Sequence, residues 1–223
     1  RMDLTETIEQ TQEKFRNLAS KHQALVSEVF GPTIQGEGPF QGRRAFFLRL
    51  QQCTSPICYF CDSKSSTSIG GELWSWVAIR ARLEQLGMTD GDLLVITGGE
   101  PFLQFLEGII DTIQEGRKTR IIIQVETSAK TQGMVVDSLD GIPANIDHVV
   151  CSPKYLGHQW WVDSTTIDAL LGMQGIGADT SISFKFPVEN TESVEAVKAF
   201  VRSRGIPAKI VWLMPLGVLK QTQ

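Results

Sequence analysis

Residues 53–61 read CTSPICYFC and contain three of the chain's four cysteines, in the spacing Cys53-x4-Cys58-x2-Cys61. Three thiolates this close together, with no fourth nearby, indicate a metal centre with an incomplete set of protein ligands. A structural zinc site or an electron-transfer cluster normally takes four protein ligands, so a four-iron cluster held by three cysteines leaves one iron open to another molecule. The alternative is a zinc knuckle whose fourth ligand is a distant His or Cys.

The composition indicates one globular domain that works on a small molecule. The chain has 223 residues, 42% of them hydrophobic, which is enough for a sizeable core. A net charge of -4 argues against nucleic acid or an anionic membrane as a partner bound through bulk charge. We expect a cytoplasmic protein, because no apolar run approaches the roughly 18 residues of a membrane span and the N-terminus lacks a signal-peptide core. Bunched cysteines in a reducing compartment favour metal ligation over disulfides.

Polar or glycine-rich residues follow most of the predicted strands. We predict buried strands over residues 45–50, 93–96, 121–125, 148–151, 181–186 and 209–214. The first four lead into the cysteine loop, Thr97-Gly98-Gly99-Glu100-Pro101, Glu126-Thr127-Ser128 and Ser152-Pro153-Lys154. In parallel α/β folds the site is built on the loops after the strands. The alternation of strands and helices therefore predicts an α/β fold, a parallel sheet curled into a partial, open (β/α)6-type barrel.

The other segments are expected to support that sheet. We predict helices over residues 3–20, 73–86, 102–115, 165–171 and 190–204, and an aromatic loop over 155–161. Residues 26–40 are predicted to form a Gly- and Pro-rich loop in which Gln35 and Glu37 offer polar recognition. Cys151, alone, is interpreted as a buried small apolar residue. We expect residues 1–25 to be a helical extension without chemistry, and 26–223 to be the core domain.

Arg49 is the one charged residue of its strand and needs an anion as a partner. That anion is either an acidic side chain of the protein or the carboxylate of a ligand. The position of Arg49 shortly before the cysteine loop favours the ligand.

Taken in order, these motifs resemble the radical S-adenosylmethionine superfamily and, within it, the 7-carboxy-7-deazaguanine synthases. The match runs from about Glu28 to Pro215. Superfamily-level signals are the three cysteines followed by Asp62, and the run Gly98-Gly99-Glu100-Pro101. The narrower signals are Phe30 with Ile34-Gln35-Gly36-Glu37-Gly38, Phe47-Leu48-Arg49-Leu50, Val125-Glu126-Thr127-Ser128, Ser152-Pro153-Lys154 and Trp212-Leu213-Met214-Pro215.

The resemblance implies a radical lyase of queuosine-type 7-deazapurine biosynthesis. Cys53, Cys58 and Cys61 would hold a 4Fe-4S cluster whose open iron binds S-adenosylmethionine. Cleavage of that cofactor would give a 5'-deoxyadenosyl radical, which would start the ring contraction of 6-carboxy-5,6,7,8-tetrahydropterin to 7-carboxy-7-deazaguanine with loss of ammonia. The cofactors carry this chemistry, and the protein orients them. The resemblance also implies a reductant such as flavodoxin, and a homodimer.

The resemblance further implies a role for individual residues. Those that match substrate-binding positions are Ile34, Gln35, Gly36, Arg49, Thr97 and Pro215. Those that match S-adenosylmethionine-binding positions are Gly99, Glu126, Ser128, Ser152, Pro153 and Lys154. Magnesium would bind at Ser63, where the family pattern usually has Thr; a serine hydroxyl is an equally hard oxygen ligand.

Two further departures from the family pattern concern lengths. The first cysteine gap has four residues instead of the commonest three, and we expect the cluster to form if the three sulfurs still converge. The chain ends at Gln223, soon after Met214-Pro215, so we expect substrate closure or dimer contacts to differ from those of relatives that continue.

Two other functions compete with this one. An activating enzyme that generates a glycyl radical on a partner protein would share the cysteines and the Gly-Gly-Glu-Pro run, but should lack Arg49 and the loop ahead of it. A non-enzymatic metal-binding module would explain the cysteines and leave the polar loops after the strands without a purpose.

Overall fold

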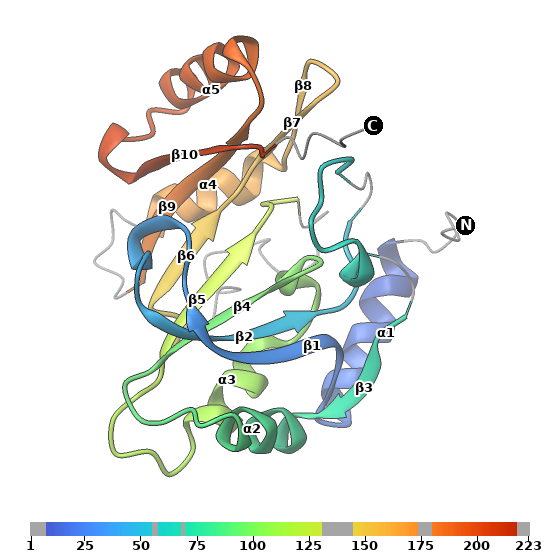
Figure 1. Cartoon of the computed structure of the whole chain (residues 1–223). Coiled ribbons are helices and arrows are strands. Elements are labelled where there is room, and N and C mark those ends of the chain that lie inside the picture. Colours follow the sequence, from blue (N-terminus) through green and yellow to red (C-terminus); the bar gives the residue numbers. More distant parts are fainter. Residues whose placement is uncertain (1–7, 55–57, 68–69, 131–144, 174–179, 218–223) are drawn as a thin grey trace, which may run out of the picture.

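The computed structural model describes residues 8–54, 58–67, 70–130, 145–173 and 180–217, and these fold into a sheet flanked by helices (Figure 1). The α-helices are α1 (Ile8–Ser20), α2 (Trp76–Gln85), α3 (Leu106–Gln114), α4 (Ser164–Met173) and α5 (Thr191–Ser203). The strands are β1 (Gln23–Ile34), β2 (Arg44–Leu50), β3 (Glu72–Ser75), β4 (Leu93–Gly98), β5 (Ile122–Thr127), β6 (His148–Cys151), β7 (Lys154–Leu156), β8 (Gln159–Trp161), β9 (Ser181–Val188) and β10 (Val211–Pro215). Short 3-10 helices are η1 (Gly38–Phe40), η2 (Lys64–Ser66), η3 (Pro101–Leu103) and η5 (Ala208–Ile210).

The main sheet is open and mostly parallel. In the described part of the chain its order is β10-β9-β6-β5-β4-β2-β1-β3, and all neighbours from β10 to β2 pair in parallel. β1 pairs antiparallel with β2 and with β3, and the edge strands β10 and β3 are not paired with each other. This arrangement confirms the predicted α/β fold with a partial, open barrel of parallel strands.

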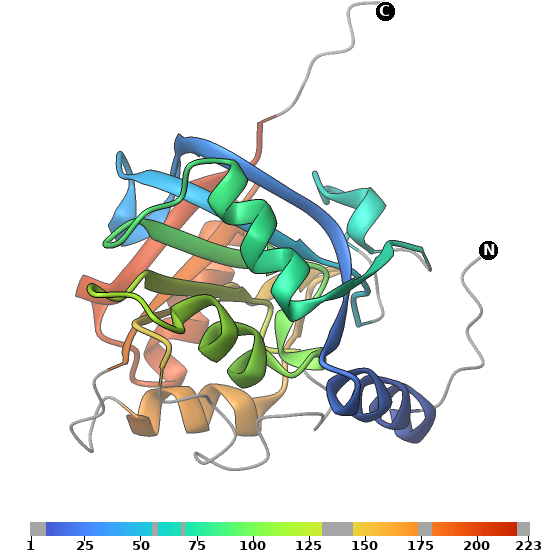
Figure 2. The ribbon, with the colours of Figure 1, turned by 90° about the horizontal axis from the view of Figure 1, so that it is seen from below.

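The outer face of the sheet carries the hydrophobic core. Side chains of successive strand residues point to opposite faces. In β2 the alternate residues Phe46, Leu48 and Leu50 are fully buried, in one core cluster with Ile79 of α2 and Ile109 of α3. Figure 2 shows α2, α3 and α4 following one another along the sheet. The helices therefore cover one face and leave the other for a site.

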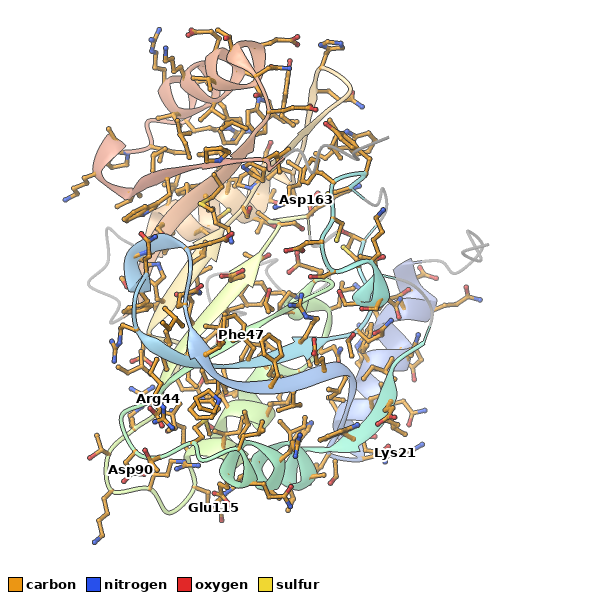
Figure 3. All side chains as sticks on the ribbon, in the orientation of Figure 1. Lys21, Arg44, Phe47, Asp90, Glu115 and Asp163 are labelled. Carbon is orange, nitrogen blue, oxygen red and sulfur yellow. The ribbon has the colours of Figure 1, made fainter. Side chains whose placement is uncertain are left out.

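The inner face changes character along the strands. Near their amino ends it is apolar, where Ala45, Leu93 and Val95 are buried against Phe40 and Phe47. Figure 3 labels Phe47 on this part of the sheet, Arg44 and Asp90 near the amino ends of the strands and Asp163 toward the carboxyl ends. Beyond the apolar patch, the inward positions are polar: Arg49, Thr97, Gln124, Glu126 and Lys185.

Residues 26–40 are not the loop that their glycines and prolines predicted. Most of the segment belongs to β1, which pairs with β2 from Val26 to Ile34. The register shifts between Phe30 and Thr33, around Gly31 and Pro32. Such an irregularity accommodates Gly and Pro within a strand, so the two residues mark a bulge and not the absence of a strand.

Three other predicted segments also differ. Residues 73–86 divide into the edge strand β3 and helix α2, because Ser75 caps the helix by accepting a hydrogen bond from the Ala78 N–H. Residues 102–115 divide into η3 and α3, since Gln104 has an extended backbone between them. Residues 155–161 form the β7–β8 hairpin, in which the Trp160 ring packs against Phe200 at 4.4 Å.

The remaining strands and helices lie within a few residues of their predicted bounds, except that residues 3–7 of the helix predicted over 3–20 lie outside the described residues. Asn190 caps α5, with a capping box that includes Ser193. Cys151 is completely buried in the core, as predicted. The division at residue 25 stays a prediction. No helix among the described residues has the length and apolar character needed to cross a membrane.

Candidate active site at the carboxyl ends of the parallel strands

The cysteine loop is closed at its base by hydrogen bonds. The chain leaves β2 at Leu50 and returns at η2, where the Gln52 N–H donates to the Ser66 carbonyl at 2.8 Å. The Gln51 side chain donates to the Ser65 carbonyl, also at 2.8 Å. We call Gln51, Gln52, Ser65 and Ser66 the loop neck; it holds Cys53, Cys58 and Cys61 on one closed excursion.

The glycine pair after β4 packs directly against this neck. The Gly99 N–H donates to the Leu50 carbonyl at 3.0 Å, and the Glu100 N–H donates to the Gln52 carbonyl at 2.8 Å. A Cβ atom on Gly99 would lie 1.8 Å from the Gln52 oxygen, and one on Gly98, which has a φ of +114°, would lie 2.2 Å from the Leu50 oxygen. Both positions therefore require glycine, and the Gly-Gly-Glu run fixes where the cysteine loop begins.

Two side chains brace the neck from other elements. Gln104 pairs with both backbone groups of Leu25 at 2.9 Å and also donates to the Gln51 carbonyl at 3.1 Å. Lys14 of α1 donates to the Gln52 side chain at 2.7 Å. Because Gln104 is buried, its bonds tie β1 and the neck together across the core.

The three sulfurs lie close enough to affect one another electrostatically. Burial raises the pKa of Cys53 to about 12, with further contributions from Glu100, Cys58 and Cys61. Burial also raises the pKa of Cys58, which Lys154 opposes. Soft thiolates with ammonium groups beside them are a donor set that fits an iron–sulfur cluster. Among the described residues no three His, Cys, Asp or Glu side chains converge on a metal position.

Glu126 is the centre of a polar cluster on the inner face. Its Oε1 accepts from Gln124 at 3.1 Å and from Gln35 at 3.3 Å. Its Oε2 accepts from Lys185 at 3.2 Å and from Thr97 at 3.4 Å. Lys185 also binds Glu37 at 2.6 Å. We call these six residues, Gln35, Glu37, Thr97, Gln124, Glu126 and Lys185, the carboxylate cluster.

The carboxylate cluster retains a buried acceptor. Gln124 is fully buried, and within the described structure its Oε1 has no hydrogen-bond partner. A buried amide oxygen left without a donor is unfavourable by about 1–3 kcal/mol.

Arg49 lies beside the predicted magnesium residue. Its guanidinium donates to the Ser63 hydroxyl and forms an ion pair with Glu28 at 3.4 Å. The Ser63 hydroxyl in turn donates to Asp62 at 2.9 Å. The protein thus supplies Arg49 with an acidic partner of its own, the alternative that the sequence left open. The Glu28 side chain is half exposed, so a ligand carboxylate can compete for Arg49.

Glu100 links the ends of β4 and β5. It is completely buried and accepts from the Thr127 hydroxyl at 2.7 Å and from the Ser128 hydroxyl at 2.6 Å. Burial raises the pKa of Glu100, and the bonds from Ser128 and Thr127 oppose that rise. Ser128 was predicted to bind a cofactor; its hydroxyl is used here to hold Glu100.

The last predicted cofactor residues lie after β6. Ser152 and Pro153 are buried, and Lys154 donates to the Ser152 hydroxyl at 2.6 Å. Burial lowers the pKa of Lys154, whereas Cys58 and Glu126 raise it, so this ammonium lies between the cysteine loop and the carboxylate cluster. Ile34, Gly36 and Pro215 are exposed and outside the hydrogen bonds of the cluster in the described structure.

A groove of about 200 Å³ adjoins the cysteine loop. It lies between Tyr59 and Phe60 of that loop, the β7–β8 hairpin and the start of α5. The Tyr59 hydroxyl donates to Glu189 at 2.6 Å across it. The groove reaches Pro187 and Leu216, at the carboxyl ends of β9 and β10, so it belongs to the same edge of the sheet.

Sequence reasoning assigned no role to Lys185, Gln124 or Lys130. Lys185 and Gln124 are polar residues at inward positions of otherwise buried strands, a period-two signal that could have revealed them. Lys130 lies 4.5 Å above the Trp161 ring, and burial lowers its pKa, which Asp163, Cys53 and Cys58 oppose. Its position in a loop gave no periodic signal.

Comparisons with known proteins match this chain along most of its length. A protein of Hyperthermus butylicus named 7-carboxy-7-deazaguanine synthase is 32% identical over 200 residues, covering 86% of this chain and 76% of its own length. The Bacillus subtilis protein of the same name is 29% identical over 189 residues, covering 82% and 73%. The crystal structure of QueE from Escherichia coli matches the fold with a TM-score of 0.65 at 23% identity, over 92% of this chain and 88% of the other. No family model matches the chain.

Proposed function

The chain belongs to the family of 7-carboxy-7-deazaguanine synthases, and we propose that it converts 6-carboxy-5,6,7,8-tetrahydropterin into 7-carboxy-7-deazaguanine with loss of ammonia. This is a radical S-adenosylmethionine lyase reaction of queuosine-type 7-deazapurine biosynthesis. The observation that carries the proposal is the 32% identity to a synthase of that name along 86% of the chain. The residues that this activity needs come from loops of different strands that meet at one edge of the sheet.

The cofactors would occupy the cysteine loop and the strand ends beside it. Cys53, Cys58 and Cys61 would hold a 4Fe-4S cluster, and S-adenosylmethionine would lie against Gly99, Ser128 and the loop from Ser152 to Lys154. When bound, the reduced cluster supplies the electron that cleaves S-adenosylmethionine and so starts the ring contraction. The backbone hydrogen bonds of Gly99 to Leu50 and of Glu100 to Gln52 would fix the positions of these two binding regions relative to each other.

The substrate would lie across the inner face, between Arg49 and the carboxylate cluster. Arg49 would exchange Glu28 for the substrate carboxylate, with which a guanidinium forms two parallel hydrogen bonds. Thr97 and Gln35 would contact the ring, with the backbone at Ile34 and Gly36 and the rim residue Pro215 nearby. Glu126 hydrogen-bonds with Gln35 and Thr97, which favours a substrate role for Glu126 over the cofactor role expected from sequence.

Magnesium would bind at Ser63 and Asp62, beside Arg49. The Ser63 hydroxyl and the Asp62 carboxylate offer two hard oxygen atoms beside Arg49, as a magnesium site next to a substrate carboxylate requires. Isothermal titration of the loaded enzyme with Mg²⁺, with and without substrate, tests this point. Ser63→Ala should weaken magnesium binding and Ser63→Thr should retain it.

The decisive experiment is anaerobic reconstitution followed by incubation with S-adenosylmethionine, reductant, magnesium and 6-carboxytetrahydropterin. We expect 5'-deoxyadenosine and 7-carboxy-7-deazaguanine together by mass spectrometry. Deoxyadenosine without the deazapurine would favour the glycyl-radical activating function on a partner protein. A colourless zinc protein that makes neither product would favour the non-enzymatic metal-binding module.

A reductant such as flavodoxin and a homodimeric assembly stay predictions from the resemblance, and a cytoplasmic location stays a prediction from the composition of the sequence. Replacing the chemical reductant by flavodoxin and its reductase in the same assay tests the first. Light scattering of the purified chain tests the second.

A further inference from the structure

Lys185 is a buried cation between two carboxylates from distant parts of the chain. Its side chain is 10% exposed, and it lies 2.6 Å from Glu37 and 3.2 Å from Glu126. Burial alone would lower the pKa of Lys185, but Glu126 and Glu37 outweigh it and raise the pKa. The ammonium is therefore charged in the folded protein, and both carboxylates share it.

One of these carboxylates belongs to the segment that carries the predicted substrate residue Gln35. Within that segment the Gln35 N–H donates to the Arg43 carbonyl and the Gly42 N–H donates to the Gln35 carbonyl, both at 2.8 Å. The Glu37 N–H donates to the Gln35 side chain at 3.2 Å. The segment is thus a compact turn, and η1 within it lies against β9 (Figure 1). Lys185 of β9 is the ammonium that ties this turn, through Glu37, to the far side of the sheet.

The other carboxylate, Glu126, is held by bonds from four side chains. Lys185 is the one cation among these donors, which otherwise are the neutral groups of Gln35, Thr97 and Gln124. Without Lys185, Glu126 and Glu37 would face each other as like charges, and one of the two carboxylates would turn away. That change would alter what Glu126 and Gln35 present to a ligand.

We propose that Lys185 is a positioning residue for the pterin substrate: it clamps the turn at residues 35–43 onto β9 and holds the Glu126 side chain toward the site. This inference rests on the proposed function for the identity of the substrate. Lys185 acts through Glu37 and Glu126 and leaves S-adenosylmethionine binding to the other end of the site.

The kinetic test compares Lys185→Met, Lys185→Arg and Glu37→Gln in the reconstituted holoenzyme. We expect Lys185→Met to raise KM for 6-carboxytetrahydropterin about tenfold or more, with KM for S-adenosylmethionine unchanged. Lys185→Arg keeps the charge and should stay within about threefold of the wild type, whereas Glu37→Gln should raise the pterin KM in the same direction as Lys185→Met. The matched control is Lys198→Met, which removes an exposed lysine paired with Glu195 at 2.7 Å on α5 and should change neither KM.

Amide hydrogen exchange tests the clamp without relying on the reaction. Peptides that cover residues 35–43 should exchange about tenfold faster in Lys185→Met and in Glu37→Gln than in the wild type or Lys198→Met. Unchanged exchange in this turn would overturn the clamp. Faster exchange with an unchanged pterin KM would overturn the positioning role. If the wild type makes no deazapurine at all, the proposed function fails, and the exchange result alone decides whether Lys185 holds the turn.

Discussion

Gly99→Ala tests the contact that joins the Gly-Gly-Glu run to the cysteine loop. The added Cβ would lie 1.8 Å from the Gln52 oxygen, 2.3 Å from the Gln52 carbonyl carbon and 2.9 Å from the Cys53 nitrogen. All three are backbone atoms, so no side-chain rotation relieves the overlap. The strand end and the loop neck must separate by well over an ångström before the contact becomes an ordinary one.

The expected loss follows from the bonds that this separation breaks. Overpacking at a close contact costs about 1–3 kcal/mol, and the two hydrogen bonds of Gly99 and Glu100 to Leu50 and Gln52 contribute about 1 kcal/mol each. We therefore expect the free energy of unfolding to fall by about 3–5 kcal/mol, and Tm by roughly 6–20 °C for a chain of this size.

The measurement is urea denaturation of the iron-free protein, followed by iron content after anaerobic reconstitution. Iron per chain should fall with stability in Gly99→Ala, since Cys53 directly follows the displaced Gln52. Gly217→Ala is the matched control, because no atom lies within 4 Å of its added Cβ. A Gly99→Ala protein within about 0.5 kcal/mol of the wild type, with full iron content, would refute the argument that this contact positions the loop.

Three further predictions concern residues around the site. Cys151→Ala should keep the full iron content, whereas Cys58→Ala should lose most of it, because Cys151 is buried in the core away from the loop; iron analysis of both reconstituted variants decides. Gln104→Leu should lower the free energy of unfolding by about 2–4 kcal/mol by leaving backbone groups unpaired, and wild-type stability in urea would contradict this. Burial lowers the pKa of His148 to about 4 from an ordinary 6.5, so only the unfolded state gains this proton as the pH falls between those values. The wild type should lose up to about 3 kcal/mol of stability over that range, and in a pH series of denaturation curves His148→Gln should lack this loss.

The parallel strands could be predicted because the local sequence of each one is typical of a buried strand. Residues 45–50 and 148–151 are short apolar runs with turn residues after them, and both are buried strands in the structure. β1 could not be found in this way, since Gly31 and Pro32 interrupt it. Its pairing with β2 and β3 overrides the local preference of these residues for turns, and pairing is a property of the whole sheet.

The residues of the candidate site also differ in how far the sequence alone could indicate them. Residues within contiguous motifs, such as Gly99 and Arg49, could be proposed as site residues because a motif fixes their neighbours. Lys185 is the one charged residue of β9 but received no role, because its partners Glu37 and Glu126 are far away in sequence. The pairing of Arg49 with Glu28 was likewise one of two open alternatives until the register of β1 on β2 placed the two residues opposite each other.

The loop neck separates the length of the cysteine loop from the rest of the fold. The hydrogen bonds that close the neck, from Gln52 to Ser66 and from Gln51 to Ser65, lie outside the span from Cys53 to Cys61. Residues added between Cys53 and Cys58 therefore lengthen an excursion whose two ends stay where they are, and closing a slightly longer loop changes the free energy by only a few tenths of a kcal/mol. The number of residues between the cysteines can therefore change, in evolution or by design, while the sheet, the glycine pair and the carboxylate cluster keep their positions.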